Sequence, residues 1–421
     1  MSTNERFLIT GGTPLTGDVY ISGGKNTAVA IIPAVILSDE PCIIENIPNI
    51  EDVAALIEIL KYLGAKITEL PGSKLYIDPT QVNKTDLPTS LSSKLRASYY
   101  LLGALLGRIK EAHISLIGGC EIGSRPIDQH IKGFHALGVE IVNNESGITA
   151  KTNELIGADI YFDCVSVGAT INVMLAAVKA QGNTILHNAA KEPHIVDLAN
   201  FLNSMGATVR GAGTDTIRIR GTDMLHGTTY AIIPDQIETG TMMIAAAATH
   251  GDVMVHGCIP THMESLTAKL LEIGVRVLES DDCLHVRPLS KHRAVNFNTQ
   301  VYPGFPTDLQ QPMTALLTMC NGTSKVKETI YESRFNHVRG LRSMGAQVEQ
   351  TDRILTITGV PQLYGAHVCA SDLRAGAALV IAGLMANGVT EISDIYHIDR
   401  GYDHLENKLI ALGANIKRIQ V

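Results

Sequence analysis

The chain has 421 residues, with 34 basic and 42 acidic side chains, a net charge of −8 and 45% hydrophobic residues. Its length indicates two or three domains, and the excess of acidic residues argues against a general nucleic-acid-binding protein. No stretch combines uncharged and apolar residues over the roughly 18 positions of a membrane helix, and no apolar signal core follows the N-terminal residues. Seven cysteines without a CxxC pair fit a reducing compartment, so we expect a soluble, cytoplasmic protein.

An amphipathic helix that ends in an apolar-Gly-small-x-apolar pattern recurs six times along the chain. Its glycine returns at intervals of 68 to 74 residues, which indicates six structural repeats. In each copy the glycine is predicted to be the left-handed residue that ends the helix, and a strand is predicted to follow it. The six glycines are Gly64, Gly138, Gly206, Gly274, Gly345 and Gly413.

A second helix is predicted in every repeat, and it is apolar around most of its circumference, which indicates burial. These helices are expected at 27–37, 95–106, 169–178, 239–248, 309–319 and 373–385. We therefore expect an α/β fold of two inside-out, barrel-like domains, each of three repeats with buried helices and outer sheets. The first domain should span 22–233. The second should combine 234–421 with 1–21, a strand pair that completes the last repeat, and the active site should lie in the cleft between the domains.

Polar and charged residues cluster where these buried helices should begin. Helix N-termini carry free N–H groups and a partial positive charge, so they suit anions. Lys25, Arg96 and Arg374 could together bind an anionic ligand there. Ordinary helix capping is the competing explanation for the residues with capping or first-turn side chains. Those residues are Ser22, Thr27, Asp308 and Asp372.

Several segments of the chain carry a resemblance, among them SGGKNTAVAIIPA, GGCEIGSRPIDQHIKG, VSVGATINVMLAA, FPTDLQQPMTALL, SDLRAGAALVIAG and HIDRGYDHLENKL. In order and over the whole length, they resemble those of the UDP-N-acetylglucosamine 1-carboxyvinyltransferase family. The resemblance implies transfer of the enolpyruvyl group of phosphoenolpyruvate to the 3-hydroxyl of UDP-N-acetylglucosamine, with release of phosphate. The route is addition–elimination through a tetrahedral intermediate, at the first committed step of peptidoglycan-precursor synthesis. It also implies no metal or organic cofactor, no nucleic-acid or membrane partner, and a monomer.

The same resemblance assigns catalytic roles. Cys120 of the GGC segment would protonate C3 of phosphoenolpyruvate and would react with the epoxide fosfomycin. A thiol can serve as this acid because its ordinary pKa lies near 8.5. Without the flanking motif, Cys120 would be taken for a buried, inert cysteine. Asp308 would orient the sugar hydroxyl and accept its proton late, and Lys25 and Arg400 would act on the phosphoenolpyruvate.

The substrate-binding residues also follow from the resemblance. Phosphoenolpyruvate carries a phosphate and a carboxylate, which guanidinium groups bind well. Its implied contacts are Lys25, Asn26, Arg125 and Arg400. The implied contacts of UDP-N-acetylglucosamine are Arg96, Arg125, Pro126, Ile127, Asp128, Gln129, Ser166, Val167, Gly168, Asp308 and Ile330. Supporting roles are implied for Arg334, Asp372 and Arg374.

Three positions depart from the family pattern. Cys164 replaces a common lysine, Gln236 a common arginine and His194 a common glutamate. Each lost cation could weaken nucleotide binding by about 0.5–2 kcal/mol. The competing hypotheses are a shikimate-3-phosphate enolpyruvyl transferase and a non-catalytic UDP-sugar-binding paralogue. Another pattern, His256, Cys258 and His262, has spacings that a metal could use, but a strand and turn are favoured because no fourth ligand is apparent.

Overall fold

A computed structural model describes residues 5–115, 126–145, 147–289 and 291–420. The described residues divide into two compact units. Unit 1 contains residues 5–22 and 234–420, and unit 2 contains residues 23–115 and 126–233. Within the described ranges, each unit has three four-stranded sheets. No helix in these ranges is both long and apolar enough to span a bilayer.

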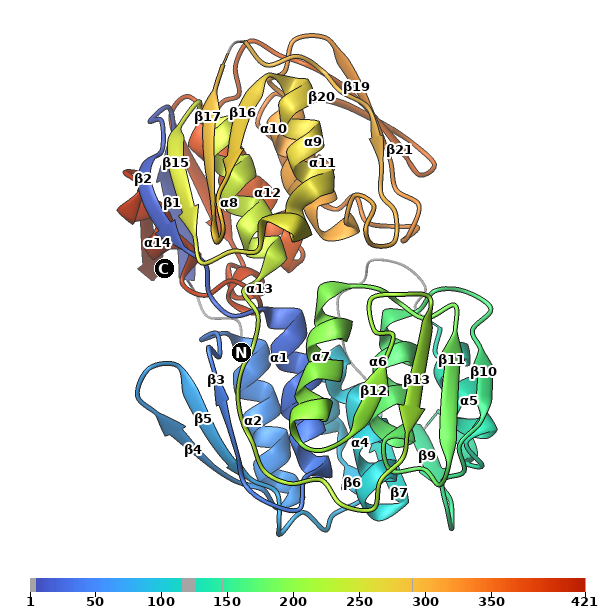
Figure 1. Cartoon of the computed structure of the whole chain (residues 1–421). Helices are drawn as coiled ribbons and strands as arrows, with labels where there is room; N and C mark the ends of the chain where they lie inside the picture. Colours follow the sequence, from blue (N-terminus) through green and yellow to red (C-terminus); the bar gives the residue numbers. More distant parts are fainter. Residues whose placement is uncertain (1–4, 116–125, 146, 290, 421) are drawn as a thin grey trace. The chain divides into compact units, whose positions relative to one another are not determined.

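In unit 2 the sheets surround three helices that run through its interior (Figure 1). The inner helices are α1 (Lys25–Ala34, extended by the 3-10 turn η1, Val35–Leu37), α4 (Tyr100–Ile109, preceded by η2, Arg96–Tyr99) and α6 (Val167–Ala177). The remaining helices are α2 (Glu51–Leu63), α3 (Thr89–Ser92), α5 (Asp128–Ala136) and α7 (Pro193–Ser204). In sheet order, the strands are β14 (Thr229–Ala231), β3 (Cys42–Glu45), β5 (Lys74–Asp78) and β4 (Lys66–Leu70); β6 (Asp86–Leu87), β7 (Glu111–Ser115), β9 (Gly147–Lys151) and β8 (Glu140–Asn144); and β10 (Asp159–Tyr161), β11 (Asn183–His187), β13 (Thr216–Arg220) and β12 (Thr208–Arg210).

Unit 1 repeats this plan. Its inner helices are α8 (Gln236–Ala248), α10 (Gln310–Leu317, preceded by η4, Thr307–Leu309) and α12 (Leu373–Met385). The other helices are η3 (Pro260–Met263), α9 (Glu264–Ile273), α11 (His337–Ser343), α13 (Tyr396–Asp399) and α14 (Leu405–Ala411). In sheet order, the strands are β16 (Val275–Glu279), β17 (Cys283–Pro288), β15 (Asp252–His256) and β2 (Thr16–Tyr20); β18 (Phe297–Asn298), β19 (Thr323–Lys327), β21 (Ile354–Thr358) and β20 (Gln347–Thr351); and β22 (His367–Cys369), β23 (Val389–Ser393), β1 (Glu5–Thr10) and β24 (Asn415–Gln420).

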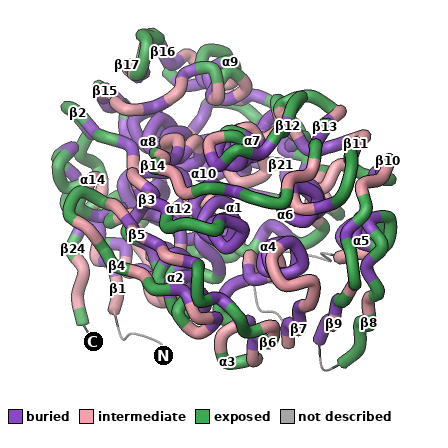
Figure 2. The backbone as a smooth tube through the Cα atoms, turned by 60° about the horizontal axis from the view of Figure 1, so that its bottom comes forward, coloured by how far each residue is buried: buried purple, intermediate pink, exposed green. Residues whose placement is uncertain are grey.

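Burial separates the two kinds of helix as the apolar pattern predicts. All 13 residues of α12 are buried, whereas α2 buries seven of its 13 residues. Figure 2 shows α1 and α12 as largely buried stretches of the backbone. A helix covered on every side needs apolar residues around its whole circumference, and a helix at the surface needs them on one face only. The prediction of three inner helices per unit is confirmed.

All six sheets share one topology. Each has one parallel pair of strands at an edge and two antiparallel pairs, as in the sheet of β6, β7, β9 and β8. Each sheet is open at both edges, so the barrel-like arrangement comes from the packing of sheets around helices. The six glycines of the repeat have φ angles between 85° and 116°. A residue with a Cβ rarely adopts this backbone conformation, so the predicted helix-ending role is confirmed.

The N-terminal strands differ from the prediction. β1 pairs with β23 and β24 and completes the last sheet, but β2 pairs in parallel with β15 and completes the fourth. The two strands therefore form no hairpin. Between them the chain passes over the end of α12, where the amide of Gly12 donates to the carbonyl of Leu384 at 2.9 Å. At this contact the chain passes from the sheet that contains β1 to the sheet that contains β2.

Candidate active site

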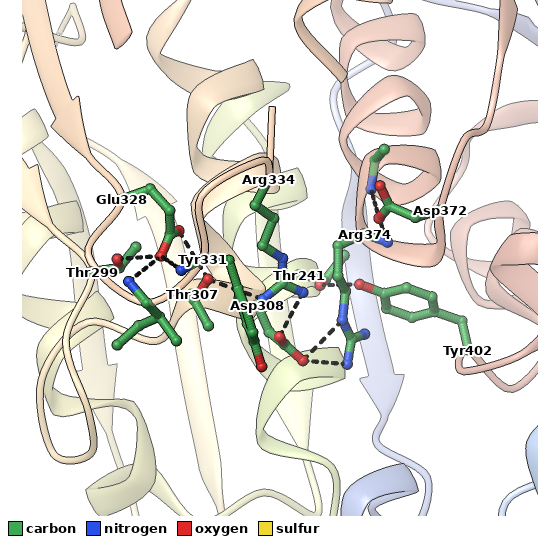
Figure 3. Close-up of polar contacts among 12 residues, drawn as sticks. Thr241, Thr299, Thr307, Asp308, Glu328, Tyr331, Arg334, Asp372, Arg374 and Tyr402 are labelled. Atoms are coloured by element: carbon green, nitrogen blue, oxygen red, sulfur yellow. Dashed lines mark hydrogen bonds and ion pairs between the residues drawn. The ribbon is translucent and has the colours of Figure 1, made fainter. Parts of the chain in front are cut away.

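In unit 1, the Asp308 carboxylate is held by two arginines that lie far apart in the sequence (Figure 3). Nε and Nη2 of Arg374 donate to Oδ2 of Asp308 at 3.2 and 3.0 Å. Nη2 of Arg334 lies 2.7 Å from Oδ1. The arginine side chains are 1% and 5% exposed, whereas the Asp308 side chain is 25% exposed. The Asp308 carboxylate is therefore partly accessible to solvent, whereas the two arginines that hold it are buried.

Local structure explains why Asp308 faces these arginines. It lies in η4, the short 3-10 turn that leads into α10, and no side chain caps the start of η4. Asp308 does not cap η4, but it lies in the first turn of η4, so the first-turn explanation holds for it. The capping explanation holds for Asp372, whose Oδ1 accepts from the amides of Arg374 and Ala375 at 2.9 Å. This cap places Arg374 in the first turn of α12, directed at Asp308.

Arg374 has a second support, the buried side chain of Tyr402. Its guanidinium carbon lies 5.1 Å from the centre of the Tyr402 ring, and the Tyr402 hydroxyl lies 2.9 Å from Oγ1 of Thr241. Burial alone would lower the pKa of Arg374, but Tyr402 and Asp308 outweigh it and raise the pKa above its ordinary value. Aromatic and carboxylate partners thus hold a permanent positive charge beneath Asp308.

In unit 2, Lys25 is the first residue of α1, and its Nζ lies 2.9 Å from the buried Oδ2 of Asp52. Its side chain is 13% exposed, and that of Asp52 is 3% exposed. The chain enters α1 through Gly23, where an added Cβ would lie 1.7 Å from the carbonyl oxygen of Asn46. A glycine is therefore required at this point. Asn26 follows in the first turn, so an ammonium and an amide lie at the start of one helix.

The predicted nucleotide-sugar residues of unit 2 come from two segments that Gln129 joins. Its side-chain amide donates to Oδ2 of Asp163 at 3.2 Å and accepts from the amide of Asp163 at 2.9 Å. A few residues later, Ser166 caps α6 by accepting from the amide of Ala169. The turn Ser166, Val167 and Gly168 therefore lies beside the start of α5.

His130 packs beneath the same turn. A Cβ on Gly168 would lie 2.9 Å from Nε2 of His130, so glycine allows this close approach. Nδ1 of His130 lies 3.0 Å from Nδ2 of Asn172, which also donates to the carbonyl of Tyr99. The guanidinium carbon of Arg96 lies 5.4 Å from the centre of the Tyr99 ring. The structure thus brings Arg96, α5 and the Ser166–Gly168 turn together.

A model of the EPSP synthase (3-phosphoshikimate 1-carboxyvinyltransferase) family matches residues 9–409. The chain is 58% identical over 416 residues to UDP-N-acetylglucosamine 1-carboxyvinyltransferase 3 of Caldanaerobacter subterraneus subsp. tengcongensis, with 99% of this chain and 100% of the relative covered. It is 57% identical to the UDP-N-acetylglucosamine 1-carboxyvinyltransferase of Clostridium botulinum, with the same coverage. The chain belongs to the UDP-N-acetylglucosamine 1-carboxyvinyltransferase family.

Solved structures agree with the fold of this family. The enolpyruvyl transferase NikO from Streptomyces tendae matches with a TM-score of 0.87 and 26% identity, over 99% of each chain. EPSP synthase from Acinetobacter baumannii matches with a TM-score of 0.75 and 16% identity, over 99% of this chain and 100% of that chain. The second likeness supports the fold alone. The predicted fold class is confirmed.

Cys120 and Arg125, two of the predicted site residues, lie outside the described residues. Arg400 follows α13 and is half-buried. Pro126 is exposed and Ile127 half-buried, directly before α5. The roles of all these residues stay predictions.

The three departures from the family pattern lie at helix starts or beside them. Gln236 begins α8, and His194 is buried in the first turn of α7. Cys164 is exposed, and partial burial together with Asp128 and Asp163 raises the pKa of its thiol. A thiol carries no positive charge in either protonation state, so Cys164 does not supply the positive charge of the usual family lysine.

Sequence reasoning missed the residues that hold the site in place. They act through side-chain contacts between distant segments, so neither spacing nor helix periodicity marks them. A polar side chain inside a predicted buried helix, such as Asn172, was the one available signal, because such groups need partners. The missed residues are Tyr99, His130, Asn172, Thr241, Thr307, Glu328 and Tyr402.

Buried imidazoles should make this family member less stable in acid. Burial lowers the pKa of His130 to about 4, and Arg96 acts in the same direction. Burial also lowers the pKa of His292 to about 4, and His250, stacked on it at 4.3 Å, adds to the effect. Unfolded histidine binds a proton near pH 6.5, so between about 6.5 and 4 the unfolded chain holds more protons and stability falls as pH falls.

His292→Phe removes one of these groups away from the candidate site. We expect urea unfolding at pH 7 and at about pH 4.5 to show a smaller loss of stability with acid in this variant than in the wild type. An equal loss in both proteins would show that His292 titrates normally in the folded chain.

Proposed function

We propose that this protein transfers the enolpyruvyl group of phosphoenolpyruvate to the 3-hydroxyl of UDP-N-acetylglucosamine and releases phosphate. The observation that carries the proposal is full-length identity of 57–58% to relatives named for this activity. The site geometry fits it, since each unit carries cations that suit an anionic substrate. The peptidoglycan role follows from this activity. We also propose that the protein acts as a cytoplasmic monomer without a metal or organic cofactor.

In the proposed addition step, the thiol of Cys120 gives its proton to C3 of phosphoenolpyruvate. The sugar oxygen then forms a bond to C2, and the hydroxyl proton passes to the Asp308 carboxylate. In the elimination step, C3 returns a proton to the Cys120 thiolate, the double bond forms again and the bond between C2 and the phosphate oxygen breaks. Inorganic phosphate leaves and takes up the proton from Asp308, directly or through solvent. Lys25, Arg125 and Arg400 would bind the phosphate and carboxylate charges throughout.

The contacts of Asp308 define its role in this scheme. A carboxylate that already accepts hydrogen bonds from two guanidinium groups is a weak base. It can nevertheless orient a hydroxyl from the outset, because Arg334 and Arg374 fix its direction. Asp308 would therefore take the proton late, when the new C–O bond has made the hydroxyl more acidic.

The competing acceptor is shikimate 3-phosphate, so the purified protein should be given phosphoenolpyruvate with each acceptor separately and with both together. We expect phosphate release with UDP-N-acetylglucosamine alone, and no inhibition by shikimate 3-phosphate at equal concentration. Release with shikimate 3-phosphate alone would contradict the proposal and would favour the other enolpyruvyl transferase.

A further inference from the structure

Glu328 is a fully buried carboxylate that joins two parts of unit 1 (Figure 3). It follows β19 and is 0% exposed. Its Oε1 accepts from Oγ1 of Thr299 and from the amide of Ile330, both at 2.8 Å, and from the amide of Tyr331 at 3.2 Å. Its Oε2 accepts from Oγ1 of Thr307 at 2.8 Å. Hydroxyl and amide donors thus satisfy a carboxylate that would otherwise be costly to bury.

The Oε1 side fixes the loop that contains Ile330. Two successive amides, of Ile330 and Tyr331, point at one oxygen, so the loop must turn back toward the end of β19. Thr299 ties the same loop down a second time, because its Oγ1 accepts from the amide of Thr329 at 2.8 Å. The orientation of the Ile330 backbone therefore depends on this carboxylate oxygen.

Three successive contacts connect Oε2 of Glu328 to Asp308. Thr307 donates its only hydroxyl proton to Glu328, so its lone pairs face away, and one of them accepts from Nη1 of Arg334 at 2.9 Å. The other terminal nitrogen of Arg334, Nη2, lies 2.7 Å from Oδ1 of Asp308. The buried carboxylate of Glu328 thus orients the Thr307 hydroxyl, and this hydroxyl orients the Arg334 guanidinium. The guanidinium in turn orients the accessible carboxylate of Asp308.

We propose that Glu328 is a positioning residue for the acceptor substrate, which fixes the Ile330 loop with one oxygen and the direction of Asp308 with the other. The inference rests on the proposed function, in which both Ile330 and Asp308 contact UDP-N-acetylglucosamine. Glu328 itself contacts neither substrate in this scheme. Its two oxygens should therefore have separable kinetic effects, one on acceptor binding and one on the chemical step.

Two threonine variants test the two sides separately. Thr299→Val removes a donor to Oε1, and Thr307→Val removes the donor to Oε2. Thr318→Val is the matched control, because Thr318 is fully buried in unit 1, as Thr299 is, and its hydroxyl donates to the carbonyl of Ala315 at the far end of α10. All three variants lose one threonine hydroxyl that donates a hydrogen bond, from a buried residue in Thr299 and Thr318 and from a half-buried one in Thr307. A purely structural role would lower their melting temperatures alike and leave kcat and KM unchanged.

Glu328→Gln tests the carboxylate directly. The amide oxygen can keep the contacts of Oε1, but the amide nitrogen then faces Thr307 and competes with Arg334 for its oxygen. This variant should therefore behave like Thr307→Val. Because both changes act on the same step, their combination should lower kcat no further than the stronger single change.

We expect Thr307→Val and Glu328→Gln to lower kcat by about tenfold or more. Thr299→Val should raise KM for UDP-N-acetylglucosamine about fivefold and leave kcat close to wild type. Equal kcat in Thr307→Val and Thr318→Val, or wild-type kinetics in Glu328→Gln, would overturn the role of Glu328 alone. If Glu328→Gln does not fold, the threonine variants decide. Wild-type protein that releases no phosphate would instead contradict the proposed function and this inference together.

Discussion

Cys120→Ala is expected to lower the rate of phosphate release by about 10²- to 10⁴-fold, the usual contribution of a general acid. The reason is that no other group is assigned to protonate C3 of phosphoenolpyruvate. Cys120→Asp should keep activity, since a carboxylic acid can donate the same proton, and it should resist fosfomycin because it has no thiol. Steady-state phosphate release, with and without prior treatment by the epoxide, measures both effects.

Cys369→Ala is the matched control for this change. Cys369 is exposed in β22, and its thiol donates to Oδ2 of Asp394 at 2.9 Å, outside the candidate site. It should turn over like the wild type and remain sensitive to the epoxide. Normal turnover in Cys120→Ala would show that the acid is another group. A strongly lowered melting temperature in Cys120→Ala would favour a buried, inert cysteine.

Asp308→Asn should impair both catalysis and stability. The amide cannot accept the sugar proton, so kcat should fall by about 10²- to 10⁴-fold. The change also leaves Arg334 and Arg374 facing an amide that bears no charge, although both arginines are buried. Removing one partner of a buried ion pair costs roughly 3–5 kcal/mol, and since Asp308 is partly exposed we expect about 3 kcal/mol. Urea unfolding and kcat at saturating substrates provide the two readouts.

Glu391→Gln separates the loss of an ion pair from the loss of this particular carboxylate. Glu391 pairs with Arg6 and His367 in unit 1, at the sheet formed by β1 and β23. Its variant should lose little stability, because the Arg6 and His367 side chains reach solvent, and it should keep full turnover. Comparable losses of kcat in both variants would show that the effect of Asp308→Asn is general destabilisation.

Most of the fold could be predicted because each repeat carries its own local signals. The helix-ending glycines, such as Gly64 and Gly413, need a left-handed backbone, and the inner helices need apolar residues on every side. These requirements act within a single repeat, so they are visible in the sequence. The pairing of β2 with β15 could not be found in this way, because it joins residues more than 200 positions apart and either sheet could accept the strand.

The same distinction between local signals and long-range contacts applies to the candidate site. Charged residues at helix starts, such as Lys25 and Arg374, could be predicted because helix N-termini follow from local pattern. The contacts among the site residues could not, since Asp308, Arg334 and Arg374 meet only after the chain has folded. Glu328 shows the limit most clearly. A glutamate at the end of a strand usually faces solvent, and only the burial of Glu328 and its four hydrogen-bond donors reveal another role.

The central claim is an acceptor-dependent enolpyruvyl transfer that depends on Cys120. It is tested most directly by phosphate release from phosphoenolpyruvate with and without UDP-N-acetylglucosamine, before and after fosfomycin treatment, with mass spectrometry of the peptide that contains Cys120. We predict release only with the acceptor, and its loss as Cys120 gains one adduct. Binding of UDP-N-acetylglucosamine without any release would contradict the claim and would make this chain a nucleotide-sugar-binding protein.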